Sequence, residues 1–274
     1  NISAREKLTP PIGEIKGLAT VLPAAKAVFA IGFAYFPNKK ERSQIKIREG
    51  FLIVAIFWFV LSFFGAIPFL MDESLKFSLV DAVFESASGW TTTGATVVSN
   101  IDNLNKPLLL YRQLLQWLGG IGIVVLVLAI LPILGVGGMY LYKAETSSPV
   151  KDNKLSPRIT ETAKSLWGVY IVLTIACAVL YKIAGMSYFD AIGHSFSTVS
   201  IGGFSTHDTS IGFYSSDLIK IICMVFMFLS ALNFVLHFLF YKNKSLTVYT
   251  SNSEMKSFLL IIIILLLLVC LLYT

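Results

Sequence analysis

The stretch Asp81-Ala-Val-Phe-Glu-Ser-Ala-Ser-Gly-Trp-Thr-Thr-Thr-Gly-Ala-Thr96 returns without a gap as Asp190-Ala-Ile-Gly-His-Ser-Phe-Ser-Thr-Val-Ser-Ile-Gly-Gly-Phe-Ser205. Asp, Ala, Ser, Ser and Gly recur in register, and a small residue ends each copy. An internal repeat of this kind indicates equivalent structural units that pack together. Each copy overlaps a short apolar segment, 78–88 or 188–199, which lies between two longer apolar runs.

The composition is that of a protein embedded in a lipid bilayer. Of the 274 residues, 55% are hydrophobic and 14% are charged, whereas soluble domains carry about 25% charged residues. Several apolar runs approach the roughly 20 residues that cross a hydrocarbon core of about 30 Å. We expect full spans at 12–36, 50–70, 111–134, 166–184, 218–240 and 258–274.

Basic residues predict the orientation of these spans, and they account for the net charge of +6 better than a nucleic-acid-binding face does. Short loops rich in Lys and Arg remain on the cytoplasmic side of a membrane. Three such loops occur, whereas 71–110 and 185–217 carry few basic residues and are expected outside. The basic residues are Lys39, Lys40, Arg42, Lys46 and Arg48; Lys143, Lys151, Lys154, Arg158 and Lys164; and Lys242, Lys244 and Lys256.

The short segments 78–88 and 188–199 are predicted to enter the membrane and turn back. If either crossed fully, the basic loops on its two sides would face opposite compartments. A helix of this length rises about 1.5 Å per residue and reaches roughly half way through the bilayer. Asp81 and Asp190 stand near the expected start of each half-helix, where a carboxylate caps free N–H groups.

The runs that follow the half-helices contain the predicted ion-binding site. They read Thr91-Thr-Thr-Gly94 and Ser200-Ile-Gly-Gly203. Non-helical backbone at membrane depth is tolerated where it is buried in protein or lines a watery cavity. Potassium exchanges its hydration shell for rings of backbone carbonyls, and glycine permits the unusual φ values of such a strand. The alternative is that these small residues only let helices pack closely. Two such runs in register, each after a half-length helix, favour the ion-binding interpretation over this alternative.

A family resemblance extends over essentially the whole chain. The stretches that carry it are Arg48-Glu-Gly-Phe-Leu-Ile-Val54, Ser88-Gly-Trp-Thr-Thr-Thr-Gly-Ala-Thr96, Tyr111-Arg-Gln-Leu-Leu-Gln-Trp-Leu-Gly-Gly120, Ala129-Ile-Leu-Pro-Ile-Leu-Gly-Val-Gly-Gly138, and Phe189-Asp-Ala-Ile-Gly-His-Ser-Phe-Ser197 continuing to Ile201-Gly-Gly-Phe-Ser-Thr-His-Asp208. Together they resemble the Trk and Ktr family of potassium uptake membrane subunits, and more closely its bacterial TrkH branch.

The resemblance implies an all-α integral membrane fold that is similar to a potassium channel. Four units of span, re-entrant half-helix, filter loop and span would surround one pore. K⁺ would be the transported substrate, with no covalently bound cofactor. A cytoplasmic nucleotide-binding regulatory subunit, similar to TrkA, would gate the pore, and full-length chains would form a homodimer in the bacterial inner membrane. The implied potassium-binding residues, which we call the filter strands, are Thr92, Thr93 and Gly94 in the first unit and Ile201, Gly202 and Gly203 in the second.

The chain holds two such units and the start of a third. A fourfold carbonyl cage needs four strands, so we expect a fragment of a longer protein, with a dimer of half-length chains as the alternative. The expected divisions are 1–47 with the first span and a basic loop, 48–138 with the first pore unit, 139–165 as a cytoplasmic loop, 166–241 with the second pore unit, 242–256 as a further loop, and 257–274 as the start of a third unit.

Two other functions are weighed against a potassium pore. A secondary transporter that couples K⁺ to H⁺ or Na⁺ also breaks its helices, although it more often shows inverted repeats or an acidic residue in mid-span. Enzyme activity is not expected, because no nucleophile with a base, metal cluster or phosphate loop is recognisable. Pore-rim or packing roles are expected for Glu85, which has no identifiable partner, and for His194, His207 and His237; close helix packing is expected at Gly119, Gly120 and Gly122.

Overall fold

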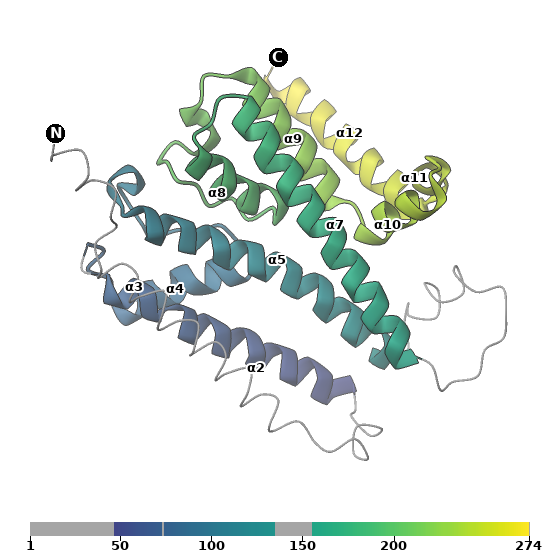
Figure 1. Ribbon diagram of the computed structural model, residues 1–274, viewed down its shortest axis with the longest axis horizontal. Coiled ribbons are helices and arrows are strands. Elements are labelled where there is room, and N and C mark those ends of the chain that lie inside the picture. Colours follow the sequence, from purple (N-terminus) through teal and green to yellow (C-terminus); the bar gives the residue numbers. More distant parts are fainter. Residues whose placement is uncertain (1–46, 73, 135–154, 274) are drawn as a thin grey trace, which may run out of the picture.

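The computed structural model describes residues 47–72, 74–134 and 155–273. The expected span at 12–36 and most of the first two basic loops lie outside these residues. In the described part of the chain every regular element is a helix. The long helices run past one another, and the short helices α4 and α8 lie beside them (Figure 1). This arrangement is the all-α fold that the sequence predicts.

The first unit contains one half-length helix between two longer ones. Its elements are α2 (Ile47–Gly65), α3 (Ile67–Met71), α4 (Leu79–Trp90), a 3₁₀ turn (Ile101–Asn103) and α5 (Lys106–Leu134). A break at Ala66 divides the expected span at 50–70 into α2 and α3. Pro68 stands in the first turn of α3, a position that tolerates its missing N–H.

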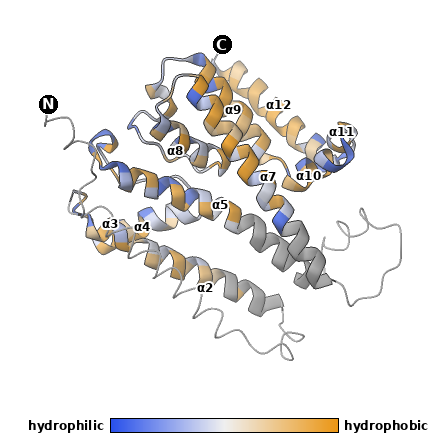
Figure 2. Cartoon of the chain, in the orientation of Figure 1, coloured by the Kyte–Doolittle hydropathy of each residue, from blue (hydrophilic) through white to orange (hydrophobic). Residues whose placement is uncertain are grey.

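The second unit repeats the order of long helix, half-helix, 3₁₀ turn and long helix, but its break lies in the last of these helices. It consists of α7 (Leu155–Ile183), α8 (Tyr188–Val199), a 3₁₀ turn (Ser210–Phe213), α9 (Asp217–Ala231) and α10 (Phe234–Asn243). Two helices follow it, α11 (Thr247–Ser251) and α12 (Ser253–Tyr273). Residues 164–183 of α7 and all of α12 are long and apolar enough to cross a membrane. Figure 2 shows that α12 is apolar along most of its length, which suits contact with lipid or with further protein.

The two half-helices begin in the same way. In α4, the Asp81 amide donates to the Ser78 Oγ at 3.3 Å, and the Ser78 amide donates to the Asp81 carboxylate at 3.1 Å. In α8, the Asp190 amide donates to the Ser187 Oγ at 3.1 Å. These side chains satisfy N–H groups that the helix itself leaves free. The predicted positions of Asp81 and Asp190 at the helix starts are confirmed.

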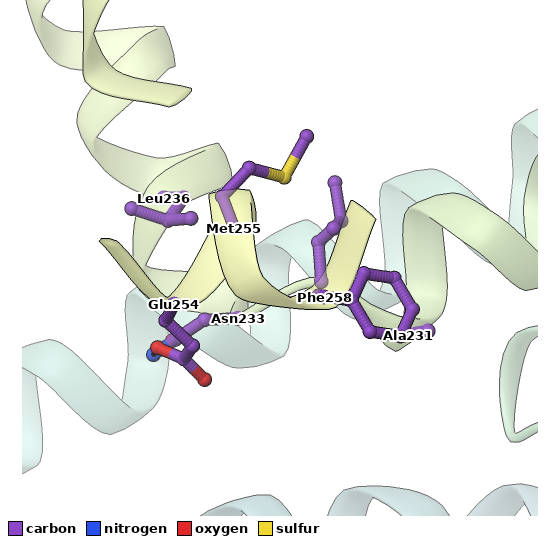
Figure 3. A pocket seen from close by; sticks show the side chains of 7 residues that line it. Ala231, Asn233, Leu236, Glu254, Met255 and Phe258 are labelled. Carbon is purple, nitrogen blue, oxygen red and sulfur yellow. Dashed lines mark hydrogen bonds between the residues drawn. The ribbon is translucent and has the colours of Figure 1, made fainter. Parts of the chain in front are cut away.

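The expected full span at 218–240 is not a single continuous helix, because α9 and α10 meet at an angle of 91°. Leu232 is extended between them, and the Asn233 Oδ1 accepts from the Val235 amide at 3.1 Å to start a new helix. An asparagine side chain that caps a helix in this way competes with continuation of the preceding one. The Asn233 Nδ2 also donates to Glu254 of α12 at 3.2 Å, beside the small pocket drawn in Figure 3.

Helix α5 connects the two units. It packs against α2 and α4 of its own unit and against α7 and α8 of the second. In Figure 1 it runs through the middle of the molecule, between the elements of the two units. Polar side chains on α5 can therefore reach the ends of both half-helices, which is where the filter strands begin.

Candidate functional site: two adjacent filter strands

The chain leaves both half-helices through the same set of backbone hydrogen bonds. In each unit the last helical turn closes with one i to i−4 bond, one i to i−3 bond and one i to i−5 bond. The amides of Thr91, Thr92 and Thr93 donate to Ala87, Gly89 and Ser88, and those of Ser200, Ile201 and Gly202 donate to Phe196, Thr198 and Ser197. The sequence repeat is thus also a repeat of backbone geometry.

Each filter strand contains two residues in the left-handed region. Thr92 has φ 55° and Gly94 has φ 77°, while Ile201 has φ 55° and Gly203 has φ 86°. This region suits glycine but disfavours β-branched residues such as Thr and Ile. Strained backbone persists where the surrounding structure imposes it, and it is concentrated at functional sites. Its occurrence in register in both units indicates a shared role.

The two filter strands lie next to each other. A Cβ atom built on Gly94 would overlap the carbonyl oxygen of Gly202. Within the described part of the chain, none of the carbonyl oxygens of Thr92, Thr93, Ile201 or Gly202 accepts a hydrogen bond. These oxygens are therefore free to coordinate a cation. The structure brings the two predicted filter strands together at Gly94, Gly202 and Gly203, and the binding of K⁺ by the six residues stays a prediction.

Glu85 has a partner that sequence reasoning did not find. Its Oε1 lies 2.8 Å from the Nε of Arg112 on α5, and both side chains are fully buried. Charged groups at membrane depth are expected to pair with one another. The sequence does contain a signal for this pair, because Arg112 lies near the start of the apolar run 111–134 and a charge there needs a partner of opposite sign. The expectation that Glu85 lacks a partner is therefore corrected.

Gln116 is a second buried polar residue behind the filter strands. Its Oε1 accepts from the Ser197 Oγ at 2.9 Å and from the Phe204 amide at 3.1 Å. A Cβ on Gly202 would collide with the Gln116 side chain. Gln116 thus supports the second filter strand from the helix of the first unit. It follows Arg112 by four residues, the spacing that places two side chains on one helix face.

The three histidines occupy different places. His194 is buried in α8, and its Nε2 lies 3.2 Å from the Thr206 Oγ1. In the repeat it takes the position of Glu85. His237 contacts the carbonyl of Leu229 at 2.9 Å across the α9–α10 bend. His207 lies beyond the second filter strand and contacts the first unit.

Residues 101–102 and 207–208 form what we call the outer contact between the two units. The His207 Nδ1 donates to the Asp102 carboxylate at 2.6 Å, and the Ile101 amide donates to the Asp208 carboxylate at 2.9 Å. The His207 ring also stacks on Phe213, with ring centroids 3.6 Å apart. The hydrogen bond from His207 lowers the pKa of Asp102 below its ordinary value of 3.8.

The outer contact is expected to weaken in acid. When folding lowers the pKa of a carboxyl, that group stabilises the folded state at any pH above its pKa in the unfolded chain. This stabilisation is lost as the pH falls through the pKa of the group in the folded protein. The melting temperature of the detergent-solubilised parent is expected to exceed that of Asp102→Asn from pH 7 to about pH 5. The difference is expected to shrink below pH 3.8.

Asp217→Asn is the matched control for the outer contact. Asp217 is exposed and pairs with Lys220 of its own helix at 2.9 Å, and exposed pairs of this kind contribute little. Its melting temperature is expected to match that of the parent throughout. A parent–Asp102→Asn difference that grows as the pH falls would contradict the proposed role of the Asp102 carboxylate.

Two half-length helices, each followed by a strand with two left-handed residues and carbonyls that accept no hydrogen bond from the described residues, define a membrane protein of the pore-loop class. The comparisons name the family: TrkH, described as a cation transport protein, matches residues 22–273. The chain therefore belongs to the TrkH family, and it is an all-α, multi-pass protein of the bacterial inner membrane.

Similar proteins include the Trk system potassium uptake protein TrkH of Halomonas elongata, which is 55% identical over 82% of this chain and 47% of the relative. The TrkH of Escherichia coli K12 is 54% identical over 84% of this chain and 48% of the relative. The crystal structure of the potassium transporter TrkH from Vibrio parahaemolyticus superimposes with a TM-score of 0.75 at 42% identity, covering 93% of this chain and 55% of that chain. The chain spans about half the length of the curated relatives it matches.

Proposed function

We propose that the chain supplies two of the four filter strands of a pore for potassium uptake. The strongest support is the recurrence of left-handed backbone, at Thr92 and Gly94 in one strand and at Ile201 and Gly203 in the other. The neighbouring carbonyl oxygens accept no hydrogen bond from any described residue. Carbonyl oxygens in such strands replace the hydration shell of K⁺. No side-chain charge is needed at the coordinating atoms.

The half-helices favour a cation at the same place. Ser78 and Ser187 cap the N-termini of α4 and α8, with Asp81 and Asp190 in the first turns, and each filter strand begins where its helix ends. The C-terminus of a helix carries partial negative charge from its free carbonyls. Broken helices in membrane transporters direct such ends at cations. Both units therefore place a negative helix end beside filter-strand carbonyls, and the two strands meet at Gly94 and Gly202.

The proposed pore needs two further filter strands in addition to those of these two units. A chain of the relatives' length would provide them and close a fourfold cage. A cytoplasmic nucleotide-binding subunit and a second full-length chain are the proposed partners, as the family resemblance implies. The exposed Lys242 and Lys244, at the C-terminal end of α10, are suited to meet such a subunit, because they lie in a region predicted to be cytoplasmic.

Gly203→Ala tests the proposed function through backbone conformation alone. Gly203 has φ 86°, and a Cβ there would have no atom within 4 Å. The left-handed region costs an L-residue about 1–2 kcal/mol, so the filter strand is expected to relax and selectivity to fall. The gene is expressed from its complete reading frame in bacteria that lack other potassium uptake systems. We expect about tenfold lower selectivity for K⁺ over Na⁺, the factor that corresponds to about 1.4 kcal/mol.

Gly212→Ala is the control, because Gly212 also has open space around its Cβ position and lacks a positive φ. It is expected to leave potassium uptake unchanged. Equal selectivity in the Gly203→Ala variant and the parent would contradict the assignment of the second filter strand. Uptake by the parent that stops without an imposed H⁺ or Na⁺ gradient would favour an ion-coupled transporter instead.

A further inference from the structure

Arg112 lies where the two units meet behind the filter strands. Its Nε donates to the Glu85 Oε1 at 2.8 Å, and neither side chain is exposed. Its guanidinium carbon lies 4.4 Å from the centre of the Phe204 ring, a distance typical of a cation–π contact. Phe204 directly follows Gly203. A fixed positive charge on α5 therefore contacts residues of both pore units.

The guanidinium fork reaches equivalent residues of the two units. Its Nη2 donates to the Thr96 Oγ1 at 2.9 Å, and its Nη1 donates to the Ser205 carbonyl at 3.4 Å. Thr96 and Ser205 occupy the same position of the repeat, each two residues beyond a filter glycine. One rigid planar group thus spans the two chain segments that leave the filter strands.

Glu85 attaches the first of these segments to its own half-helix. Its carboxylate accepts from the Thr96 Oγ1 at 2.9 and 3.0 Å and from the Val97 amide at 3.1 Å. Glu85 therefore holds the chain beyond Gly94 against α4, while Arg112 connects that chain to the second unit. Neither side chain donates a hydrogen bond to a filter carbonyl, so the contacts of the pair bear on those oxygens through the position of the strands.

Stability does not explain why this position carries a buried ion pair. Removing two charges from water is costly, and apolar residues of similar volume often stabilise a protein equally well or better. A guanidinium that donates to three different residues differs from an apolar group because its planar geometry fixes the distances and directions of its partners. Spacing between strands is the property that a carbonyl cage requires.

We propose that Arg112 and Glu85 are positioning residues that set the spacing between the first two filter strands and, through it, the preference for K⁺ over Na⁺. This inference rests on the proposed function. It adds residues outside the strands to those that determine selectivity. It assigns Arg112 to both strands, because its contacts with Thr96 and Ser205 come from one side chain.

Arg112→Lys and Glu85→Gln test the pair in the protein expressed from its complete reading frame and reconstituted in liposomes. Lysine keeps a cation for Glu85, but its single ammonium group cannot reproduce the fork to Thr96 and Ser205. Glutamine keeps the shape of Glu85 without its charge. For each variant we expect about tenfold lower selectivity for K⁺ over Na⁺, which corresponds to about 1.4 kcal/mol. Selectivity is measured as the ratio of K⁺ to Na⁺ flux per amount of inserted protein.

Tyr111→Phe is the matched control from the same turn of α5. It removes the 2.9 Å hydrogen bond from the Tyr111 hydroxyl to the Gly65 carbonyl at the end of α2, which involves no residue of either filter strand. It is expected to lower thermal stability without changing the flux ratio. Thermal stability and flux ratio together separate a general structural role from control of strand spacing.

Unchanged flux ratios in Arg112→Lys or in Glu85→Gln would overturn the inference, even if less protein were inserted. If Glu85→Gln does not accumulate, Arg112→Lys decides, because it retains a charge pair. A parent and a Tyr111→Phe control that both fail to discriminate K⁺ from Na⁺ would instead refute the proposed function. Loss of discrimination confined to the two pair variants supports the inference.

Discussion

Alanine at position 94 is expected to reduce potassium uptake to background. Gly94 has φ 77°, and a Cβ there would overlap the backbone oxygen of Gly202 in the neighbouring filter strand. The left-handed conformation alone costs an L-residue about 1–2 kcal/mol, and the overlap cannot be relieved by turning a side chain because the other atom belongs to the backbone. The two strands must therefore separate. Growth on limiting potassium and rubidium uptake measure the loss.

Alanine substitutions at three glycines are expected to reduce uptake by different amounts. Gly94 combines a positive φ with an overlap, Gly203 has a positive φ and open space, and Gly212 has open space without a positive φ. Uptake is expected to fall most for Gly94→Ala, less for Gly203→Ala and not at all for Gly212→Ala. Near-normal uptake by Gly94→Ala, at a normal amount of inserted protein, would show that the strands do not form the cation path.

The half-helices could be predicted from the sequence because their signals are local. The segment 188–199 matches α8, and 78–88 lies within two residues of α4. Charge in the flanking loops decided that these segments turn back, and the acidic residue near the start of each one indicated its cap. The repeat added a second, independent example of each feature, which a single unit would not have offered.

The supports behind the filter strands could not be predicted in the same way. Glu85 and Arg112 are 27 residues apart, and their contact depends on how α5 packs against α4. Periodicity does not reveal such a pairing, although a charge in an apolar run signals that a partner is needed. The bend after α9 was missed for a different reason: hydropathy is continuous through Leu232, and Asn233 was the one residue that marked a new helix start.

Gly119→Ala is expected to move α5 away from the end of α4 within the first unit. A Cβ on Gly119 would overlap the carbonyl of Trp90, the last residue of α4. A Cβ on the adjacent Gly120 would lie 3.0 Å from the Cβ of Ser200, the residue that caps α8. Because these two glycines lack a side chain, α5 can pack closely against the C-terminal ends of both half-helices. The close packing expected at Gly119 and Gly120 is therefore confirmed.

Gly122→Ala provides a comparison on the same helix with the opposite expected sign. The nearest atom to a Cβ there belongs to Trp58 at 3.7 Å, an ordinary contact. Alanine is favoured over glycine inside a helix by about 1 kcal/mol, whereas overpacking costs roughly 1–3 kcal/mol. The melting temperature in detergent is therefore expected to fall for Gly119→Ala and to stay level or rise for Gly122→Ala.

Potassium uptake is expected to fall with Gly119→Ala alone, because Trp90 precedes the first filter strand. Similar melting temperatures for the two variants would mean that α5 can shift without disturbing α4, and the filter strands would then need another support.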